Sequence, residues 1–336
     1  MKLITPPEGS RHQSAALISM LDVHHTVRFE PADRQWYACE ASSQDQAILT
    51  LFCQSLTVAQ CEAVIDGLND YLCVGGLSAH PLSGRYGETV LRAPVLYKQR
   101  QGLAARCSQL STALGVELGV QDTQPALAQP GVLVMDMDST VIQIECIDEI
   151  AKLAGLGEQV SQVTEKAMRG ELDFAQSLIS RVACLQGVEQ AQLAQIRDQI
   201  PLMPGISVLI GELKRHGWRI ALASGGFTFF ANYLQSRLGL DRAYANELEV
   251  VDGTLTGKVA GDIVDADTKA AVVSAMAEEY QVARGQTVAL GDGANDLVMM
   301  RQAGLGVACH GKPVVNEKAD VAIRFSGLHG LLYFLR

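Results

Sequence analysis

The sequence predicts an α/β protein in which a doubly wound parallel sheet follows a smaller α+β domain. Two observations carry this prediction. After residue 130, short apolar runs alternate with helical patterns, which is typical of parallel strands joined by crossover helices. A polar segment with two prolines (QDTQPALAQP, 121–130) separates this part from an earlier region with a different rhythm. With 336 residues, 48% of them apolar, the chain can bury the cores of two domains.

The first region, residues 1–125, alternates strand-like and helix-like runs. AILTLFC (47–53) is rich in β-forming residues, and TVAQCEAVIDGLNDYL follows it with apolar residues at helical spacing behind Thr57, a helix cap. ETVLRAPVLY, QGLAARCSQLSTALG and VELGV continue the series. This β-α-β-β-α-β order is typical of a ferredoxin-like domain, and we expect residues 1–125 to form one. The region shows no catalytic constellation.

The second region, residues 126–336, contains the apolar runs expected of a buried parallel sheet. GVLVMD ends in Asp136, WRIALAS in Ser224 and TVALGD in Asp292, and LGVACH and VAIRF follow as further strands. Ligands of such sheets bind beyond the carboxyl ends of the strands, so these side chains are expected to face one crevice. Residues from about 146 to 205 have helical periodicity without a strand pattern, which predicts a small helical insertion that caps the crevice.

Composition argues against several classes of protein. The net charge of -10 is unfavourable for nonspecific nucleic-acid binding, because that needs a basic surface. The eight cysteines include no C-x-x-C pair, and so indicate neither a zinc site nor a redox motif. No run reaches about 18 apolar residues, and the N-terminal MKLITPPEGS has no apolar signal region. We therefore expect a cytoplasmic protein with reduced thiols and no membrane or nucleic-acid partner; a homodimer stays open.

The most informative motif is DMDST (136–140), directly after the first apolar strand of the second region. Two carboxylates two residues apart are costly at a strand end unless a cation or hydrogen bonds compensate them. The pattern suits phosphoryl transfer, in which one carboxylate attacks phosphorus and the other moves the proton. Asp, Ser and Thr also favour helix caps and turns, so the motif alone leaves that alternative open.

Three further signals follow in the second region. GDGAND (291–296) offers Asp292 and Asp296 as hard oxygen ligands for magnesium, with glycines that let the backbone approach a ligand. SGG (224–226) can present a hydroxyl and backbone N–H groups to a phosphate. Lys269 stands near a helix start as a cation. Each signal alone is compatible with a turn, a loop or a solvated surface residue, and only their order along one α/β domain favours a common site.

The order D-x-D-x-T, Ser-Gly, Lys, G-D-G-x-N-D resembles the haloacid dehalogenase superfamily, and most closely its phosphoserine phosphatase family. DMDSTVIQIECIDEIA, MRGELDFAQSLISRV, ALASGGF, GKVAGDIVDADTK and ALGDGAND carry the likeness, with no departure at a catalytic position. The resemblance implies a haloacid dehalogenase-like catalytic domain over 126–336, a phosphatase that hydrolyses phosphoserine in the last step of serine biosynthesis. Residues 1–125 more distantly resemble an ACT-type regulatory module.

The resemblance implies a role for each motif residue. Asp136 is expected to be the nucleophile that becomes phosphorylated, and Asp138 the acid that protonates the departing seryl oxygen and then activates water. Mg²⁺ is the implied cofactor, held by Asp136, the backbone carbonyl of Asp138 and Asp292, with Asp296 in support. The residues expected to hold the phosphate oxygens are Ser224, Gly225 and Lys269.

The resemblance places recognition of the substrate mainly on the helical insertion. Phosphoserine carries an ammonium and a carboxylate besides its phosphate, and in the family pattern Glu145 pairs with the ammonium and Arg181 with the carboxylate. Asn295 is expected to assist, and Phe174 to shield the site from water. Without the resemblance, Glu145 would suit a carboxylate at a helix N-terminus and Arg181 a charge on a helix surface.

Two other functions remain open at this level. The same nucleophile could pass the phosphoryl group to another alcohol, such as homoserine, because the choice between water and an alcohol depends on closure of the insertion. The other alternative is a sensor, in which the first domain binds an amino acid and the α/β domain is a catalytically weak signalling partner. The intact acid pair and Lys269 argue against the sensor.

Overall fold

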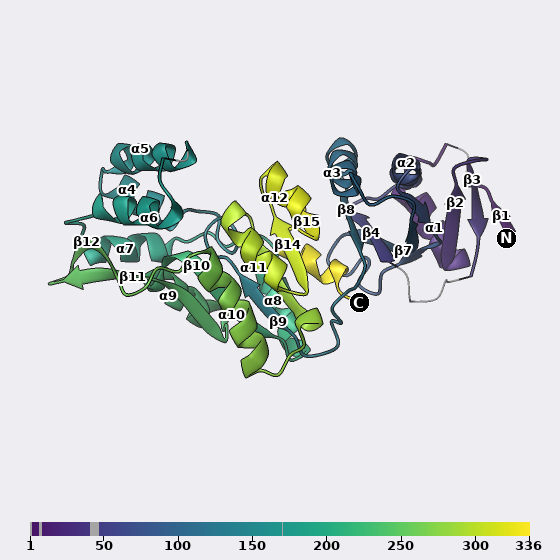
Figure 1. Ribbon diagram of the computed structural model, residues 1–336. Coiled ribbons are helices and arrows are strands. Elements are labelled where there is room, and N and C mark those ends of the chain that lie inside the picture. Colours follow the sequence, from purple (N-terminus) through teal and green to yellow (C-terminus); the bar gives the residue numbers. More distant parts are fainter. Residues whose placement is uncertain (1, 7–8, 41–46, 170) are drawn as a thin grey trace. The chain divides into compact units, whose positions relative to one another are not determined.

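By their contacts, the residues of the computed structural model form two compact units (Figure 1). The first unit comprises Met1–Pro125 together with His310–Arg336, and the second comprises Ala126–Cys309. Residues 310–336, which the sequence analysis assigned to the catalytic domain, thus group with the first unit. The structure describes residues 2–6, 9–40, 47–169 and 171–336.

The second unit is built on a sheet whose central strands are parallel. In sheet order, the strands of this unit are β12 (Thr254–Ala260), β11 (Arg242–Val251), β10 (Arg219–Phe227), β9 (Val132–Met135), β13 (Thr287–Gly291) and β14 (Leu305–Cys309). β9 pairs in parallel with β10 on one side and β13 on the other, and β13 pairs in parallel with β14. β9, β13 and β14 are buried along their whole length, as expected of strands covered on both faces. The predicted α/β fold with a parallel sheet is confirmed.

The antiparallel strands β11 and β12 form a hairpin at one edge of this sheet. Asp252 and Gly253 join them with φ values of 50° and 77°, and two left-handed residues are what a type I′ turn requires. Strand β12 also forms backbone hydrogen bonds with residues 187 and 188, which precede the hairpin in the sequence. The N–H of Gly187 donates to Leu255 O at 2.9 Å, and the N–H of Leu255 donates to Val188 O at 2.8 Å. The hairpin therefore holds the segment that joins α6 (Phe174–Ala183) to α7 (Gln190–Asp198).

The helices of the second unit fall into two groups. Those that follow β9 directly are α4 (Cys146–Leu153), α5 (Gly157–Met168), α6 (Phe174–Ala183) and α7 (Gln190–Asp198). Those between the sheet strands are α8 (Ile206–Arg215), α9 (Thr228–Leu238), α10 (Ala266–Glu279) and α11 (Leu297–Gln302). Figure 1 shows the first group gathered beside β11 and β12, and α6 packs against β12. At the start of α10, the carboxylate of Asp265 accepts the N–H of Thr268 at 2.8 Å and caps the helix.

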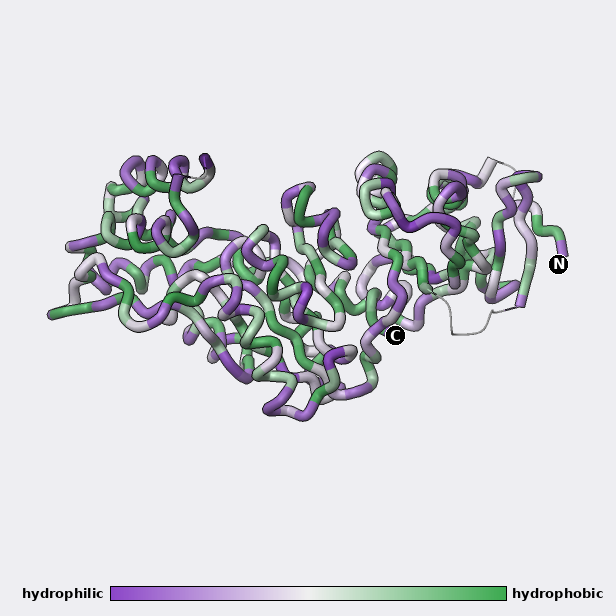
Figure 2. The backbone as a smooth tube through the Cα atoms, in the orientation of Figure 1, coloured by the Kyte–Doolittle hydropathy of each residue, from purple (hydrophilic) through white to green (hydrophobic). Residues whose placement is uncertain are grey.

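The first unit contains an antiparallel sheet. Its strands are β1 (Lys2–Ile4), β2 (Thr26–Glu30), β3 (Gln35–Ala38), β4 (Ala47–Cys53), β5 (Leu72–Val74), β6 (Leu77–Ala79), β7 (Thr89–Tyr97) and β8 (Glu117–Gln121), and its helices before the linker are α1 (Ser14–His24), α2 (Val58–Leu68) and α3 (Leu103–Leu114). The sheet order is β1-β3-β2-β6-β7-β4-β8, with β5 beside β7. Thr57 caps α2, as predicted, by accepting the N–H of Gln60 at 3.2 Å. Figure 2 shows apolar stretches along the strands of both units.

Two buried carboxylates tie the C-terminal segment to the first unit. Glu117 accepts three backbone N–H groups, from residues 324–326, at 2.8, 2.6 and 2.9 Å. Glu88 accepts the hydroxyl of Tyr333 at 2.7 Å, and the Tyr333 ring lies 4.9 Å from the ring of Phe52. These contacts explain why residues 310–336 group with the first unit. The elements of this segment are α12 (Pro313–Lys318), β15 (Val321–Ile323) and the short helix η3 (Leu328–Phe334).

Candidate active site

Three adjacent strands bring predicted site residues to one edge of the parallel sheet. Asp136 directly follows β9, Asp292 directly follows β13, and Ser224 lies in the last part of β10. Because β9 lies between β10 and β13 and all three are parallel, their carboxyl ends lie at the same edge. The N–H of Asp136 still donates to Leu290 O at 2.9 Å, so the backbone of this residue is held to the sheet.

The carboxylates of Asp136, Asp292 and Asp296 form a cluster in which one oxygen of each lies within 4.8 Å of the others. Asp296 reaches the cluster from the short helix η2 (Ala294–Asp296), and it packs directly on Gly291, where any side chain would collide with it. Lys269 Nζ lies 2.9 Å from Asp136 Oδ1 and 2.8 Å from Asp296 Oδ1, and this lysine is only 1% exposed. One buried ammonium therefore pairs with two of the three carboxylates.

The charge balance of this cluster favours a bound cation. Burial, followed by repulsion from Asp136, raises the pKa of Asp292 to about 6 and that of Asp296 to about 7. Burial lowers the pKa of Lys269, but its ion pairs with Asp136 and Asp296 outweigh this effect and raise the pKa above its usual value. Carboxylate oxygens are the ligands that hard divalent cations prefer. The residues present therefore fit a divalent metal ion.

The second carboxylate of the motif, Asp138, is separate from this cluster. Its Oδ1 accepts the backbone N–H of Cys146 at 3.4 Å. Burial, followed by repulsion from Glu145, raises the pKa of Asp138 to about 8. A Cβ at Gly226 would lie 2.8 Å from Asp138 Oδ2 and 3.1 Å from Ser224 Oγ, so the glycine lets both groups approach the same point of β10. A carboxyl group that keeps its proton near neutral pH is suited to general acid catalysis.

The end of β10 is held by a buried amide that sequence reasoning missed. Ser224 is 1% exposed, and its hydroxyl oxygen accepts the N–H of Gly226 at 2.9 Å. Asn246 Nδ2 donates to Gly225 O at 2.8 Å, and Asn246 Oδ1 accepts the N–H of Val264 at 2.8 Å. The only signal in the sequence was a polar residue, Asn246, inside the strand pattern of YANEL. Its two bonds fix the glycine backbone that the sequence analysis assigned to phosphate binding.

Two further polar residues border the acidic cluster. Thr140 Oγ1 donates to Asp292 Oδ1 at 3.1 Å. Thr140 belongs to the DMDST motif, but the sequence analysis assigned it no role. Asn295 is half-buried in η2, next to Asp296. Among the described residues, no hydrogen bond joins Asn295 to Glu145, with which the sequence analysis had grouped it. Its predicted help in binding substrate stays a prediction.

The other residues predicted to recognise the substrate come from the helical insertion. Glu145 directly precedes α4 and is exposed, and its Oε1 accepts a 2.7 Å hydrogen bond from Ser139 Oγ. Arg181, in α6, is half-buried, and its Nε is buried without a hydrogen-bond partner in the described part of the chain. The ring of Phe174 packs on Gly225, where a Cβ would lie 2.8 Å from Phe174 Cζ. Residues of the insertion thus reach the end of β10.

Comparison with known proteins agrees with this geometry. A family model described as haloacid dehalogenase-like hydrolase matches residues 131–304. The chain belongs to this hydrolase family. A phosphoserine phosphatase of Vibrio cholerae is 56% identical over 216 residues, which are 64% of this chain and 66% of that relative. The chain thus aligns with just under two thirds of that relative's length.

Solved structures of hydrolases of this family are similar as well. The unliganded crystal structure of a probable phosphoserine phosphatase from Vibrio cholerae matches with a TM-score of 0.71 and 44% identity, covering 87% of each chain. A substrate-bound phosphoserine phosphatase complex matches with a TM-score of 0.59 and 38% identity, over 62% of this chain and 99% of that one. The predicted resemblance to phosphoserine phosphatases is confirmed. In the described ranges, no helix is long and apolar enough to cross a membrane.

Proposed function

We propose that the chain hydrolyses O-phosphoserine to serine and phosphate through an aspartyl-phosphate intermediate on Asp136, as the last step of serine biosynthesis. The observation that carries this proposal is the position of Asp136. Its carboxylate is buried at the end of a parallel strand, paired with Lys269, and two residues before Asp138. The names of the Vibrio cholerae relative and of the substrate-bound structure support phosphoserine as the substrate.

The acidic cluster is the proposed site of Mg²⁺. Asp136, Asp292 and the backbone carbonyl of Asp138 would hold the ion, with Asp296 in support through its ion pair to Lys269. When bound, Mg²⁺ offsets the repulsion between the attacking carboxylate and the phosphate dianion. Oxygen-only donors and the small size of the cluster support this ion.

The proposed reaction has two steps on one carboxylate. Asp136 attacks phosphorus, the bond from phosphorus to the seryl oxygen breaks, and Asp138 gives its proton to that oxygen. Asp138 then takes a proton from water, the water oxygen attacks phosphorus, and the bond to Asp136 breaks to release phosphate. Ser224 and the N–H of Gly225, at the end of β10 that hydrogen bonds already fix, hold the phosphate oxygens together with Lys269 from α10.

The helical insertion, with α4 to α7, is proposed to act as a cap that recognises the rest of the substrate. Arg181 would bind the carboxylate of phosphoserine, and its buried Nε, which has no hydrogen-bond partner among the described residues, supports this. Glu145 would bind the ammonium, and Asn295 would assist. Phe174, already packed on Gly225, would keep water from the phosphate.

The first unit is proposed to be a ferredoxin-like, ACT-type module. The neighbouring strands β6-β7-β4-β8 with helices α2 and α3 have the strand order of that fold, and their pairings are antiparallel. It would be a regulatory domain beside a catalytic one, with the boundary near residue 125. The cytoplasmic location and a homodimer, both raised by the sequence, stay predictions.

The proposal is tested by phosphate release with Mg²⁺ from phosphoserine, phosphothreonine and phosphoethanolamine. We expect phosphoserine to have the highest kcat/KM, because only this substrate of the three combines the ammonium and carboxylate without an added methyl group. Equal turnover of all three would contradict the substrate. Product analysis with and without added homoserine separates hydrolysis from transfer to an alcohol, and no turnover at all would favour the sensor.

A further inference from the structure

The loop that follows the nucleophile contains a strained residue. Ser139 has a φ of 56°, in the left-handed region that glycine, asparagine and aspartate tolerate far better than serine. Its N–H donates to Ile144 O at 3.2 Å, which closes a loop and brings residue 145 back to residue 139. Backbone strain of this kind persists where surrounding contacts enforce it, and it concentrates at functional sites. A serine here therefore needs a reason that involves its side chain.

The hydroxyl of Ser139 forms a hydrogen bond with a carboxylate that is predicted to bind substrate. Its Oγ donates to Glu145 Oε1 at 2.7 Å. Glu145 stands at the N-cap of α4, but its side chain accepts no backbone N–H there, and the acids of the first helical turn are Asp148 and Glu149. The carboxylate is therefore not employed as a helix cap, which was the other explanation for an acidic residue at this place.

Because Glu145 is exposed, its hydrogen bond to Ser139 determines how its side chain is oriented. A glutamate side chain in solvent has several rotatable bonds and samples many orientations. One hydrogen bond from a neighbour whose backbone is fixed restricts that sampling. The second carboxylate oxygen, Oε2, stays available to a cation, because the serine hydroxyl contacts Oε1.

We propose that Ser139 is a positioning residue for substrate recognition: its hydroxyl orients the Glu145 carboxylate so that this carboxylate receives the ammonium of an aminoalkyl phosphate. This inference rests on the proposed function and assigns to Ser139 a part in discriminating between substrates. Ser139 does not touch the reacting atoms, and it acts only through Glu145. The loop itself is closed by backbone bonds that survive removal of the hydroxyl.

Three substitutions of Ser139 separate the hydroxyl from the backbone strain. Ser139→Ala removes the hydroxyl and keeps a side chain at positive φ. Ser139→Gly removes the hydroxyl and relieves the strain. Ser139→Asn tolerates the same φ and offers a side-chain N–H to Glu145, so it is the rescuing variant.

Each variant is assayed with phosphoserine, with phosphoethanolamine and with p-nitrophenyl phosphate, which has no ammonium. We expect Ser139→Ala and Ser139→Gly to raise KM for the two ammonium substrates by roughly 5- to 20-fold, with kcat changing much less, since the bond is charge-assisted but partly solvated. The loss on p-nitrophenyl phosphate should be much smaller. Ser139→Asn should recover part of the KM, and Ser139→Ala should add little to Glu145→Gln.

Equal losses on all three substrates would overturn the inference, because Ser139 would then support the loop or the phosphate site. An unchanged KM for phosphoserine in both Ser139→Ala and Ser139→Gly would overturn it as well. Failure of the wild-type protein to hydrolyse phosphoserine would instead remove the proposed function, and this inference with it. Thermal unfolding of Ser139→Ala and Ser139→Gly identifies a variant that has merely lost its fold, and the glycine variant, which relieves strain, still decides the question.

Discussion

The two ends of the parallel sheet in the second unit carry charged side chains in opposite arrangements. At the carboxyl end, one oxygen of each of Asp136, Asp292 and Asp296 lies within 4.8 Å of the others, and Lys269 pairs with Asp136 and Asp296. At the amino end, each charge meets a complementary group. Asp241, just before β11, accepts the N–H of Ile220 and a guanidinium N–H of Arg219, both at 2.9 Å.

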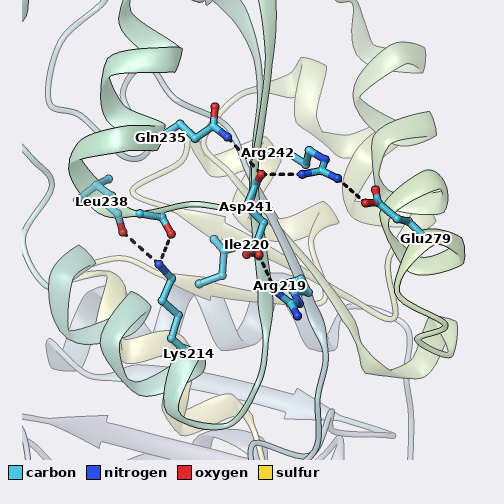
Figure 3. A network of polar contacts seen from close by, with 9 residues as sticks. Lys214, Arg219, Ile220, Gln235, Leu238, Asp241, Arg242 and Glu279 are labelled. Carbon is cyan, nitrogen blue, oxygen red and sulfur yellow. Dashed lines mark hydrogen bonds and ion pairs between the residues drawn. The ribbon is translucent and has the colours of Figure 1, made fainter.

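Figure 3 shows this amino-end network. The carbonyl of Asp241 accepts from Gln235 Nε2 at 3.2 Å and from Arg242 Nη1 at 3.1 Å, and Arg242 continues to Glu279 at 2.5 Å. Lys214 donates to the last carbonyls of α9, which suits the negative end of a helix dipole. The amino end is arranged for stability. The carboxyl end keeps like charges buried together, an arrangement that becomes favourable only with a cation and an anionic substrate.

The largest expected effect is at Asp136. Asp136→Asn removes the proposed nucleophile and should lower phosphate release by more than roughly 1,000-fold, as loss of a nucleophile does in other covalent mechanisms. The same change also reduces the crowding of carboxylates, so we expect the thermal midpoint to stay or rise. Phosphate release and thermal unfolding measure the two effects. A folded variant with near wild-type turnover would show that another residue attacks phosphorus.

Removal of the metal ion is expected to have the next largest effect on activity. We expect chelation to abolish activity, Mg²⁺ to restore it, and Ca²⁺ not to, because Ca²⁺ prefers more ligands at longer distances and would distort the attack geometry. Mg²⁺ should also raise the thermal midpoint, since it binds the folded state and relieves the repulsion among the carboxylates. Activity that persists in excess chelator would contradict the assigned role of the cluster.

Substrate recognition is expected to give an intermediate effect. Arg181→Ala would leave the substrate carboxylate without its partner, and loss of one member of a desolvated charge pair costs about 2–5 kcal/mol. That corresponds to a loss of roughly 30-fold or more in kcat/KM for phosphoserine. The loss on p-nitrophenyl phosphate should be far smaller, because that substrate has no carboxylate. Equal losses on both substrates would assign Arg181 to the phosphate site or to closure of the insertion.

The smallest effect on catalysis should come from the amino end. Asp241→Ala leaves the N–H of Ile220, a buried residue, without its acceptor, which costs about 1–3 kcal/mol of unfolding free energy. We expect a lower thermal midpoint with kcat and KM close to wild type. The matched control is Glu279→Gln, in an exposed pair with Arg242, which should change neither measurement. A large kinetic defect in Asp241→Ala would show that the two ends of the sheet are coupled.

The sequence could predict the carboxyl end well, because three apolar runs of the sequence end at Asp136, Ser224 and Asp292. Parallel strands then place these ends together without any knowledge of distant contacts. Asn246 could not be predicted in this way, since its two hydrogen bonds reach Gly225 and Val264 across the fold. The ion pairs of Lys269 and the φ of Ser139 likewise depend on packing that periodicity does not encode.

The grouping of residues 310–336 with the first unit could not be predicted from local sequence patterns either, because it depends on long-range contacts. VAIRF was identified as a strand, and β15 covers its first residues, Val321–Ile323. The bonds from Glu117 to residues 324–326 join segments about two hundred positions apart, and no local pattern reports such a pairing. The sequence therefore predicted that this segment forms a strand, but it did not predict that the strand belongs to the first unit.

This long-range pairing has a consequence for the order of events during synthesis. A ribosome completes the first 125 residues of the first unit long before it makes the segment that binds Glu117 and Glu88. At about 5–20 residues per second, the intervening chain takes roughly ten to forty seconds to translate. During that interval the surface around Phe52 that later contacts Tyr333 lacks its partner, while the second unit can already collapse. The first unit is therefore completed last, and until then the apolar surface around Phe52 is exposed and prone to aggregation.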